Sequence, residues 1–140
     1  MLDASAIVAI LGDEHDAEEL GAKMDSARVR MTTPLAIFEA SVSLARRAAS
    51  TERREDRQAM IEQWQQLVFD FLDLNQIRIV AISPDMTKHA LNAAARYGNA
   101  VGHPAALNFG DCFAYAAATA FRAPLLFKGE DFTKTDVRQA

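Results

Sequence analysis

The segment Ile77-Arg78-Ile79-Val80-Ala81-Ile82-Ser83-Pro84-Asp85 places an apolar, β-branched run directly before a helix-start signal. Residues 77–82 predict a buried strand, and the Ser-Pro-Asp that follows predicts a helix that continues to about Tyr97. A second strand is predicted from Val29 to Thr32, and Thr33-Pro34 then supplies an N-cap and a proline at the first position of a helix to about Ala49. Two strands that each lead into a helix indicate an α/β protein.

Other segments extend this alternation. A short extended piece that ends at Asp3, a helix from about Ser5 to Leu11 and a second helix that begins at 13–16 are expected first. Apolar residues spaced i, i+1, i+4, i+7 and i+8 from Met60 to Leu72 predict a long amphipathic helix. The alanine-rich segment 109–121 predicts a buried helix, and 125–127 a last strand. Strands that are apolar on both faces predict a parallel sheet with helices on both sides.

Length and composition limit the classes of protein that fit. The chain has 140 residues, half of them hydrophobic, so we expect one domain over residues 1–140 with a substantial core. Its 15 basic and 19 acidic residues give a net charge of -4, so any contact with nucleic acid must be local. The single cysteine, Cys112, is expected to be a core residue in a reducing, cytoplasmic compartment. No apolar run approaches the length of about 18 residues that would suggest a membrane span.

Four acidic residues stand where a parallel sheet collects its ligands, at or beyond the carboxyl ends of strands and in the helices that follow them. Each has a structural explanation. Asp3 can be an N-cap, and Glu39 can form an ion pair with Arg46. Asp111 can interact with a helix dipole, and Asp131 can belong to a turn with Gly129.

The four acids together favour a functional explanation. Three lie next to apolar elements, and no lysine or arginine accompanies them in the same segments. Converging carboxylates should repel and raise one another's pKa unless a divalent metal neutralises them. Ligand sets made only of oxygen favour Mg²⁺ or Mn²⁺, and such ions activate water for attack on a phosphodiester. The pattern therefore predicts phosphodiester hydrolysis.

Four segments carry motifs that occur together, in this order, in one family. They are Asp3-Ala4-Ser5-Ala6, Thr33-Pro34-Leu35-Ala36-Ile37-Phe38-Glu39-Ala40, His103-Pro104-Ala105-Ala106-Leu107-Asn108-Phe109-Gly110-Asp111-Cys112-Phe113, and Leu126-Phe127-Lys128-Gly129-Glu130-Asp131-Phe132 with Thr135-Asp136. Together they resemble a PIN-domain ribonuclease of the VapC toxin type over essentially the whole chain. The Leu-Asn-Phe-Gly-Asp block is the most specific part of the resemblance.

The resemblance implies both a fold and an activity. The fold is a PIN domain, a Rossmann-like parallel sheet in a three-layer α/β/α arrangement. The activity is that of a metal-dependent endoribonuclease, the toxin of a bacterial type II toxin-antitoxin pair. Expected partners are the RNA substrate, a second copy of the chain in a homodimer, and a VapB-type antitoxin whose tail lies across the active-site groove.

The resemblance also assigns roles to individual residues. The family's acidic quartet falls on Asp3, Glu39, Asp111 and Asp131, which would hold Mg²⁺ or Mn²⁺, and its hydroxyl near the first acid falls on Ser5. Asn108 is expected to orient a carboxylate, and Asp136 to be a further acidic neighbour. Glu130, Asp131 and Asp136 remain alternatives for the fourth acidic ligand.

Two other functions remain open. One is a non-catalytic PIN-like module whose acidic pocket docks a basic partner peptide, which needs negative potential but no metal. The other is a DNA-directed nuclease, because recognition of the 2′-hydroxyl depends on geometry that the sequence does not specify.

Five arginines between positions 46 and 57 form the other notable group of charges. They could bind an RNA backbone, but acidic residues are interspersed among them, so we expect the solvated end of a helix-helix connection. The group consists of Arg46, Arg47, Arg53, Arg54 and Arg57.

Overall fold

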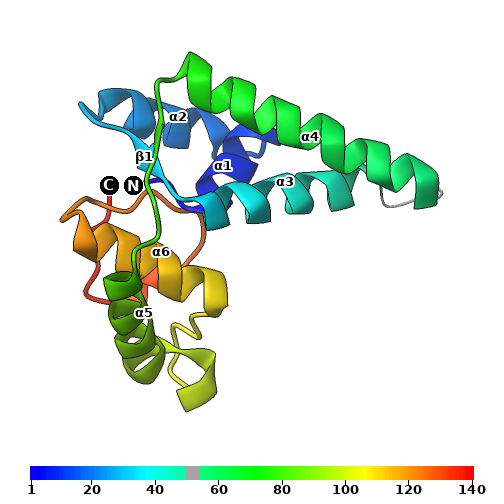
Figure 1. The fold of residues 1–140 in the computed structure, drawn as a ribbon. Coiled ribbons are helices and arrows are strands. Elements are labelled where there is room, and N and C mark those ends of the chain that lie inside the picture. The colour runs from blue at the N-terminus through cyan, green and yellow to red at the C-terminus, as the bar shows by residue number, and fades with distance from the viewer. Residues whose placement is uncertain (50–53) are drawn as a thin grey trace.

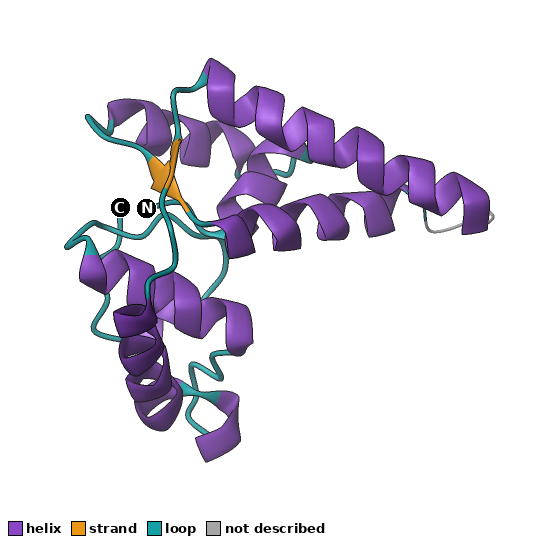
Figure 2. Cartoon of the chain, in the orientation of Figure 1, coloured by secondary structure: helices purple, strands orange, loops and turns teal. Residues whose placement is uncertain are grey.

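Short parallel segments form the middle layer of the protein in the computed structural model, which describes residues 1–49 and 54–140. Strand β1 (Met31–Thr32) pairs in parallel with β2 (Arg78–Ile79). On the other side of β1, Leu2 donates its N–H to the carbonyl oxygen of Met31 at 2.7 Å. Parallel bridges then join Leu2 to Leu126 and Leu125 to Gln139. Figure 2 shows the strand pair at the centre of the molecule, with both chain ends beside it.

The spatial order of these segments is Rossmann-like. Numbered along the chain, they run third, second, first, fourth, fifth across the layer, where the first is 1–3 and the fourth is 125–127. In such an order the connections diverge between the first and fourth segments, and ligands bind at the carboxyl ends there. Asp3 ends the first segment and Lys128 follows the fourth. The topology therefore places the site beside these two residues.

The first and fourth segments direct alternate side chains into two separate cores, as a period of two requires. Met1 and Leu125 belong to a core with helices α5 (Pro84–Tyr97) and α6 (Phe109–Ala120). Leu2 and Leu126 belong to the other core, with helices α1 (Ala4–Leu11), α2 (Ala17–Ser26), α3 (Pro34–Ala48) and α4 (Arg54–Leu74). Figure 1 shows the two groups of helices on opposite sides of the layer. This confirms the predicted three-layer α/β/α architecture.

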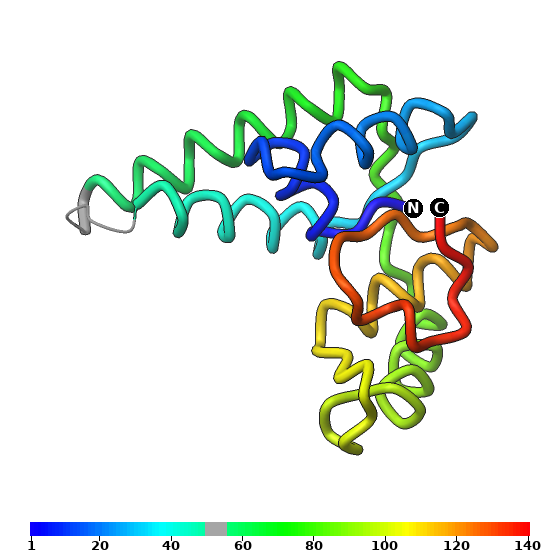
Figure 3. Tube along the Cα trace, turned by 180° about the vertical axis from the view of Figure 1, so that it is seen from behind, coloured from blue at the N-terminus to red at the C-terminus, as the bar shows by residue number. Residues whose placement is uncertain are grey.

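The helices that carry site residues start as predicted. Thr33 caps α3, and its hydroxyl accepts the N–H of Ala36 at 3.2 Å. Helix α6 is largely buried, and Cys112 lies in the core as expected. In α4 the predicted apolar face buries Val68, Phe71 and Leu72. Figure 3 shows α3 and α4 extending together away from the chain ends.

Two predicted elements differ in extent. The buried strand predicted at 77–82 is only β2, and both of its residues are exposed. It lies at the end of the segment order, and among the described residues it pairs only with β1, so one edge faces solvent. The strand predicted from Val29 begins at Met31, and Val29 is 52% exposed.

The second helix begins later than predicted. Asp13 has a φ of +49°, a left-handed conformation that interrupts helical geometry, and α2 starts at Ala17. Glu14 and Asp16 therefore lie in a connection and are free to bind elsewhere. Two short 3-10 turns, Asn99–Val101 and Asp131–Lys134, complete the secondary structure.

The expectations about Arg53 and about the connection at 50–51 lie outside the described residues. Within the described ranges, no helix combines the length and the apolar character needed to cross a membrane.

Candidate active site

A cavity of about 590 Å³ opens at the carboxyl ends of the first and fourth segments. Most of the predicted site residues line it: Asp3, Ser5, Glu39, Asn108 and Asp111. They come from the end of the first segment, the first turn of α1, the middle of α3 and the start of α6. The fold thus brings together side chains that are more than a hundred residues apart in the sequence.

Asp3 is buried at the floor of this cavity, with 4% of its surface exposed. Its Oδ2 atom accepts the backbone N–H of Ser5 at 3.0 Å and the Ser5 hydroxyl at 2.5 Å. The Ser5 hydroxyl oxygen in turn accepts the backbone N–H of Lys128 at 3.0 Å. Ser5 therefore joins the ends of the first and fourth segments and fixes the orientation of the Asp3 carboxylate.

Asp111 and Asn108 orient each other through a capping box at the start of α6. The Asn108 side-chain oxygen accepts the N–H of Asp111 at 3.1 Å, and Asp111 Oδ2 accepts the N–H of Asn108 at 2.8 Å. The expected role of Asn108 as an orienting group therefore has a specific hydrogen-bonding basis.

Glu39 lies directly over the backbone of Gly110. A Cβ atom at position 110 would stand 2.6 Å from the Glu39 Cδ and closer still to both carboxylate oxygens. Only glycine leaves room for this carboxylate, which makes Gly110 a site residue that chemistry-based reasoning missed. In the described part of the chain Glu39 forms no ion pair, so the suggested pairing with Arg46 is absent.

The three lining acids perturb one another electrostatically. Burial is the largest cause in every case: it raises the pKa of Glu39 to about 7 and that of Asp111 to about 6, and it raises the pKa of Asp3. The charge of Asp3 raises the pKa of both other acids, and the charge of Asp111 raises that of Glu39. Such like-charge coupling in a partly dry cavity is typical of functional sites.

The three alternatives for a fourth acid occupy different environments. Asp131 is exposed, and its charge raises the pKa of Asp3 and Asp111. Glu130 accepts a hydrogen bond from the Thr133 hydroxyl at 3.3 Å. Asp136 binds the Tyr115 hydroxyl at 2.7 Å and Arg96 at 3.0 Å, and it lines a different depression. The electrostatic coupling to Asp3 and Asp111 favours Asp131 of these three, although Asp131 is not among the residues that line the cavity.

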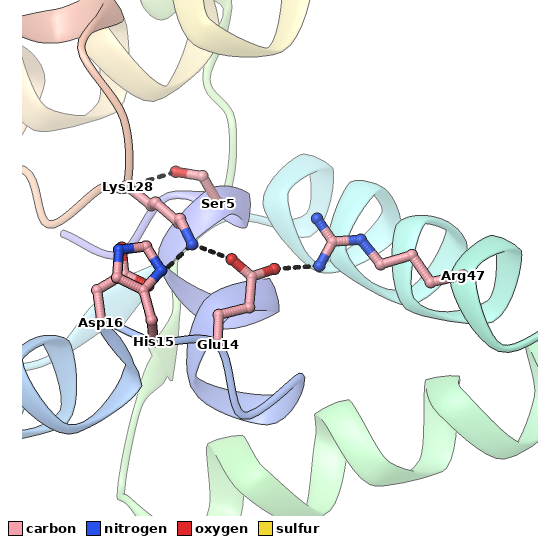
Figure 4. Close-up of polar contacts among 6 residues, drawn as sticks. All are labelled: Ser5, Glu14, His15, Asp16, Arg47 and Lys128. Carbon is pink, nitrogen blue, oxygen red and sulfur yellow. Dashed lines mark hydrogen bonds and ion pairs between the residues drawn. The ribbon is translucent and has the colours of Figure 1, made fainter.

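Basic side chains also line the cavity, contrary to the expectation that no cations accompany the acids. Arg46, Arg47 and Lys128 belong to the lining. The Glu14 carboxylate contacts both Arg47 and Lys128, and Asp16 binds Lys128 at 2.8 Å (Figure 4). Sequence reasoning missed Glu14 and Lys128, although the position of Lys128 directly after a strand at the switch point was an available signal.

The donor set suits a hard divalent cation. Asp3, Glu39 and Asp111 offer only oxygen, and their mutual repulsion is what a cation would relieve. Over residues 1–49 and 54–140, however, no three such side chains are gathered into a preformed metal site. One oxygen each of Asp3 and Asp111 is engaged by its backbone neighbours. Binding an ion would therefore require the carboxylates to turn towards one another.

A Rossmann-like three-layer fold with acids at its switch point is the arrangement that the resemblance to PIN domains implied. The model of the PIN domain family matches residues 1–138, and this chain belongs to that family.

Characterised relatives extend the comparison along the whole chain. A VapC ribonuclease of Rhizobium meliloti is 43% identical over 138 residues, which cover 97% of each chain. Ribonuclease VapC42 of Mycobacterium tuberculosis is 36% identical over 141 residues, covering 100% of this chain and 98% of its own. Ribonuclease VapC of Mycolicibacterium smegmatis is 37% identical over 137 residues, covering 98% and 96%. These findings confirm the resemblance that the sequence motifs indicated.

Proposed function

We propose that this chain is an endoribonuclease of the VapC type that hydrolyses RNA phosphodiester bonds with the help of Mg²⁺ or Mn²⁺. The observation that carries the proposal is the coupled set of acids, Asp3, Glu39 and Asp111, with raised pKa values in one cavity at the switch point. The names of the relatives, all ribonucleases, supply the substrate class.

Each residue of the site has a defined task in this proposal. Asp3, Glu39 and Asp111 would hold the ion, with Asp131 as the fourth acid. Ser5 and Asn108 keep Asp3 and Asp111 oriented through the hydrogen bonds described above. When bound, the ion supplies an acidified water and neutralises the charge that develops on the phosphate. Glu39 must give up its proton for the ion to bind, because only the carboxylate form is a ligand.

The direct test is cleavage of a labelled single-stranded RNA by the purified chain with Mg²⁺ or Mn²⁺ and with EDTA. We expect cleavage only with metal, and none from the Asp111→Asn variant. Asp73→Asn, the same change at an exposed residue of α4, serves as the matched control and should cleave normally.

Three results would contradict the proposal. Cleavage that survives EDTA would exclude the metal mechanism. Cleavage of a DNA oligonucleotide in preference to RNA would indicate a DNA-directed nuclease. No cleavage of either, together with tight binding of a basic peptide, would support the non-catalytic docking module.

We further propose that the chain is the toxin of a pair and that its VapB-type antitoxin presents an arginine or lysine to this cavity. A guanidinium that forms a bidentate pair would bind the uncompensated acids in place of the metal ion. Replacing each basic residue of the antitoxin tail by alanine should relieve inhibition at one position at least. Full inhibition by a tail without any Arg or Lys would refute this.

The homodimer is a separate proposal. Light scattering of the purified chain should give twice its mass of 15.4 kDa. A monomer at micromolar concentration that still cleaves RNA would refute it.

A further inference from the structure

Helix α3 carries both acidic and basic side chains along one face. Glu39, Val42, Ser43, Arg46 and Arg47 are spaced i, i+3, i+4, i+7 and i+8, and all five line the cavity. Arg46 follows Glu39 by two turns, which is about 10 Å along the helix axis at a rise of about 1.5 Å per residue. The cavity therefore has an acidic part at Glu39 and a basic part further along the same helix.

The contacts of each cation show which of them is available to a ligand. Lys128 uses its ammonium group on both Glu14 and Asp16, so these two carboxylates balance its charge (Figure 4). Arg47 directs one N–H at Glu14, and a guanidinium has five such donors. Glu14 thus holds Arg47 in place, while the other donors of Arg47 have no hydrogen-bond partner among the described residues.

Arg46 differs from the other two. It is exposed at the rim of the cavity, and in the described part of the chain its side chain has no hydrogen bond or ion pair. Arg46 and Arg47 both line the cavity, and Glu14 holds the guanidinium group of Arg47. A guanidinium suits a phosphate because it donates paired hydrogen bonds to the phosphate oxygens. Both arginines are exposed in the last turn of α3, as predicted for a solvated helix end, and both also line the cavity.

We infer that Arg46 and Arg47 form a phosphate-binding subsite that holds the RNA backbone beside the cleavage centre, with Glu14 positioning Arg47. The inference rests on the proposed ribonuclease function and adds the path of the substrate, which runs from the acids along α3. A stacked strand advances about 3.4 Å per nucleotide, so the bound phosphate lies within about three nucleotides of the scissile one.

The test measures binding separately from catalysis. A labelled single-stranded RNA is titrated with protein in EDTA at several salt concentrations, for wild type, Arg46→Gln and Arg47→Gln. Arg28→Gln is the matched control, because Arg28 is exposed and lines a different depression. Each lost phosphate contact should weaken binding and reduce the slope of log K against log salt by about 0.7. The Arg28 variant should keep the slope of the wild type.

Two further measurements separate the subsite from other effects. Arg46→Lys keeps the positive charge but lacks the paired N–H donors of a guanidinium, so we expect weaker RNA binding with the salt slope of the wild type. With Mg²⁺, Arg46→Gln should raise KM by a larger factor than it lowers kcat, because the subsite acts in binding and the acids are untouched. Melting curves of the two Arg46 variants should coincide with that of the wild type, because Arg46 is exposed and unpaired in the described structure.

The outcomes distinguish this inference from the proposed function. If the wild type cleaves RNA but Arg46→Gln and Arg47→Gln bind it with unchanged affinity and slope, the subsite is wrong and the ribonuclease stands. If Arg28→Gln loses as much RNA affinity as either cavity variant, the effect comes from net charge and the subsite is also wrong. If the wild type cleaves no RNA, the proposed function itself fails.

Discussion

The Asp111→Asn variant separates a metal-binding acid from a structural one by the sign of its effect on stability. The substitution removes the charge but keeps an oxygen that can accept the Asn108 N–H, which Asp111 now accepts at 2.8 Å. The start of α6 is therefore preserved. A merely structural acid in a first helical turn would lose about 0.3–1 kcal/mol of favourable dipole interaction on neutralisation.

The structure predicts a gain instead. The pKa of Asp111 is raised from 3.8 to about 6, chiefly by burial and then by Asp3 and Asp131. One pKa unit corresponds to about 1.4 kcal/mol, so ionising this group costs about 3 kcal/mol at full strength. Because the side chain is partly exposed, solvent screening reduces the cost to about 1–2 kcal/mol.

The dependence on pH follows from the direction of the shift. Because the folded-state pKa of Asp111 is raised, the contribution of this group to stability is most favourable below about pH 4 and is lost as the pH rises through about 6. The variant lacks this loss. Its advantage should therefore grow from pH 4 to pH 8 by about 1–2 kcal/mol, which is about 4–8 °C in Tm for a chain of this size.

The assay is a set of thermal melts of wild type, Asp111→Asn and the Asp73→Asn control at pH 4 and pH 8, in EDTA and in Mg²⁺. The gain at pH 8 should shrink with Mg²⁺, because the ion stabilises only the intact site. RNA cleavage should be lost. A variant that is less stable than the wild type in EDTA at pH 8 and still active would refute the metal-site reasoning.

Three other outcomes test separate parts of the site. Gly110→Ala should abolish cleavage by displacing Glu39. The control Gly21→Ala has open space around its Cβ, so it should raise stability by about 0.5–1 kcal/mol and leave cleavage unchanged. Normal cleavage by Gly110→Ala would contradict the close contact. At low Mg²⁺, kcat/KM should rise about tenfold from pH 6 to pH 8, since Glu39 with a pKa of about 7 must ionise to bind the ion, and a flat profile would contradict that pKa. Asp136→Asn should lower the free energy of unfolding by about 1 kcal/mol in a denaturant titration, because the hydrogen bond to the Tyr115 hydroxyl weakens. This variant should keep full cleavage, and loss of cleavage would restore Asp136 as a candidate metal ligand.

Local signals in the sequence were sufficient for most of the fold. Thr33-Pro34 started α3, and the alanine-rich run formed a buried helix, because capping and apolar periodicity act within a few residues. The burial of β2 could not be predicted in this way. Its apolar composition fits a central strand, and only its place at the end of the segment order exposes it.

The acids of the candidate site were found because they follow strands, whereas their surroundings required the tertiary structure. Glu14 contacts Lys128 across 114 positions of sequence, and it can do so only because Asp13 adopts a left-handed conformation that delays α2. The contact between Glu39 and Gly110 likewise joins two helices. Neither relation has a local signal.

The pairing of the first segment with the fourth also bears on synthesis of the chain. The N–H of Asp3 bonds to the carbonyl oxygen of Leu126, and the Ser5 hydroxyl accepts the N–H of Lys128. Lys128 is therefore synthesised 123 residues after Ser5. At about 5–20 residues per second, the gap lasts about 6–25 seconds. Until then the acids stay dispersed, so a nascent chain that has not yet reached Lys128 carries no assembled candidate site.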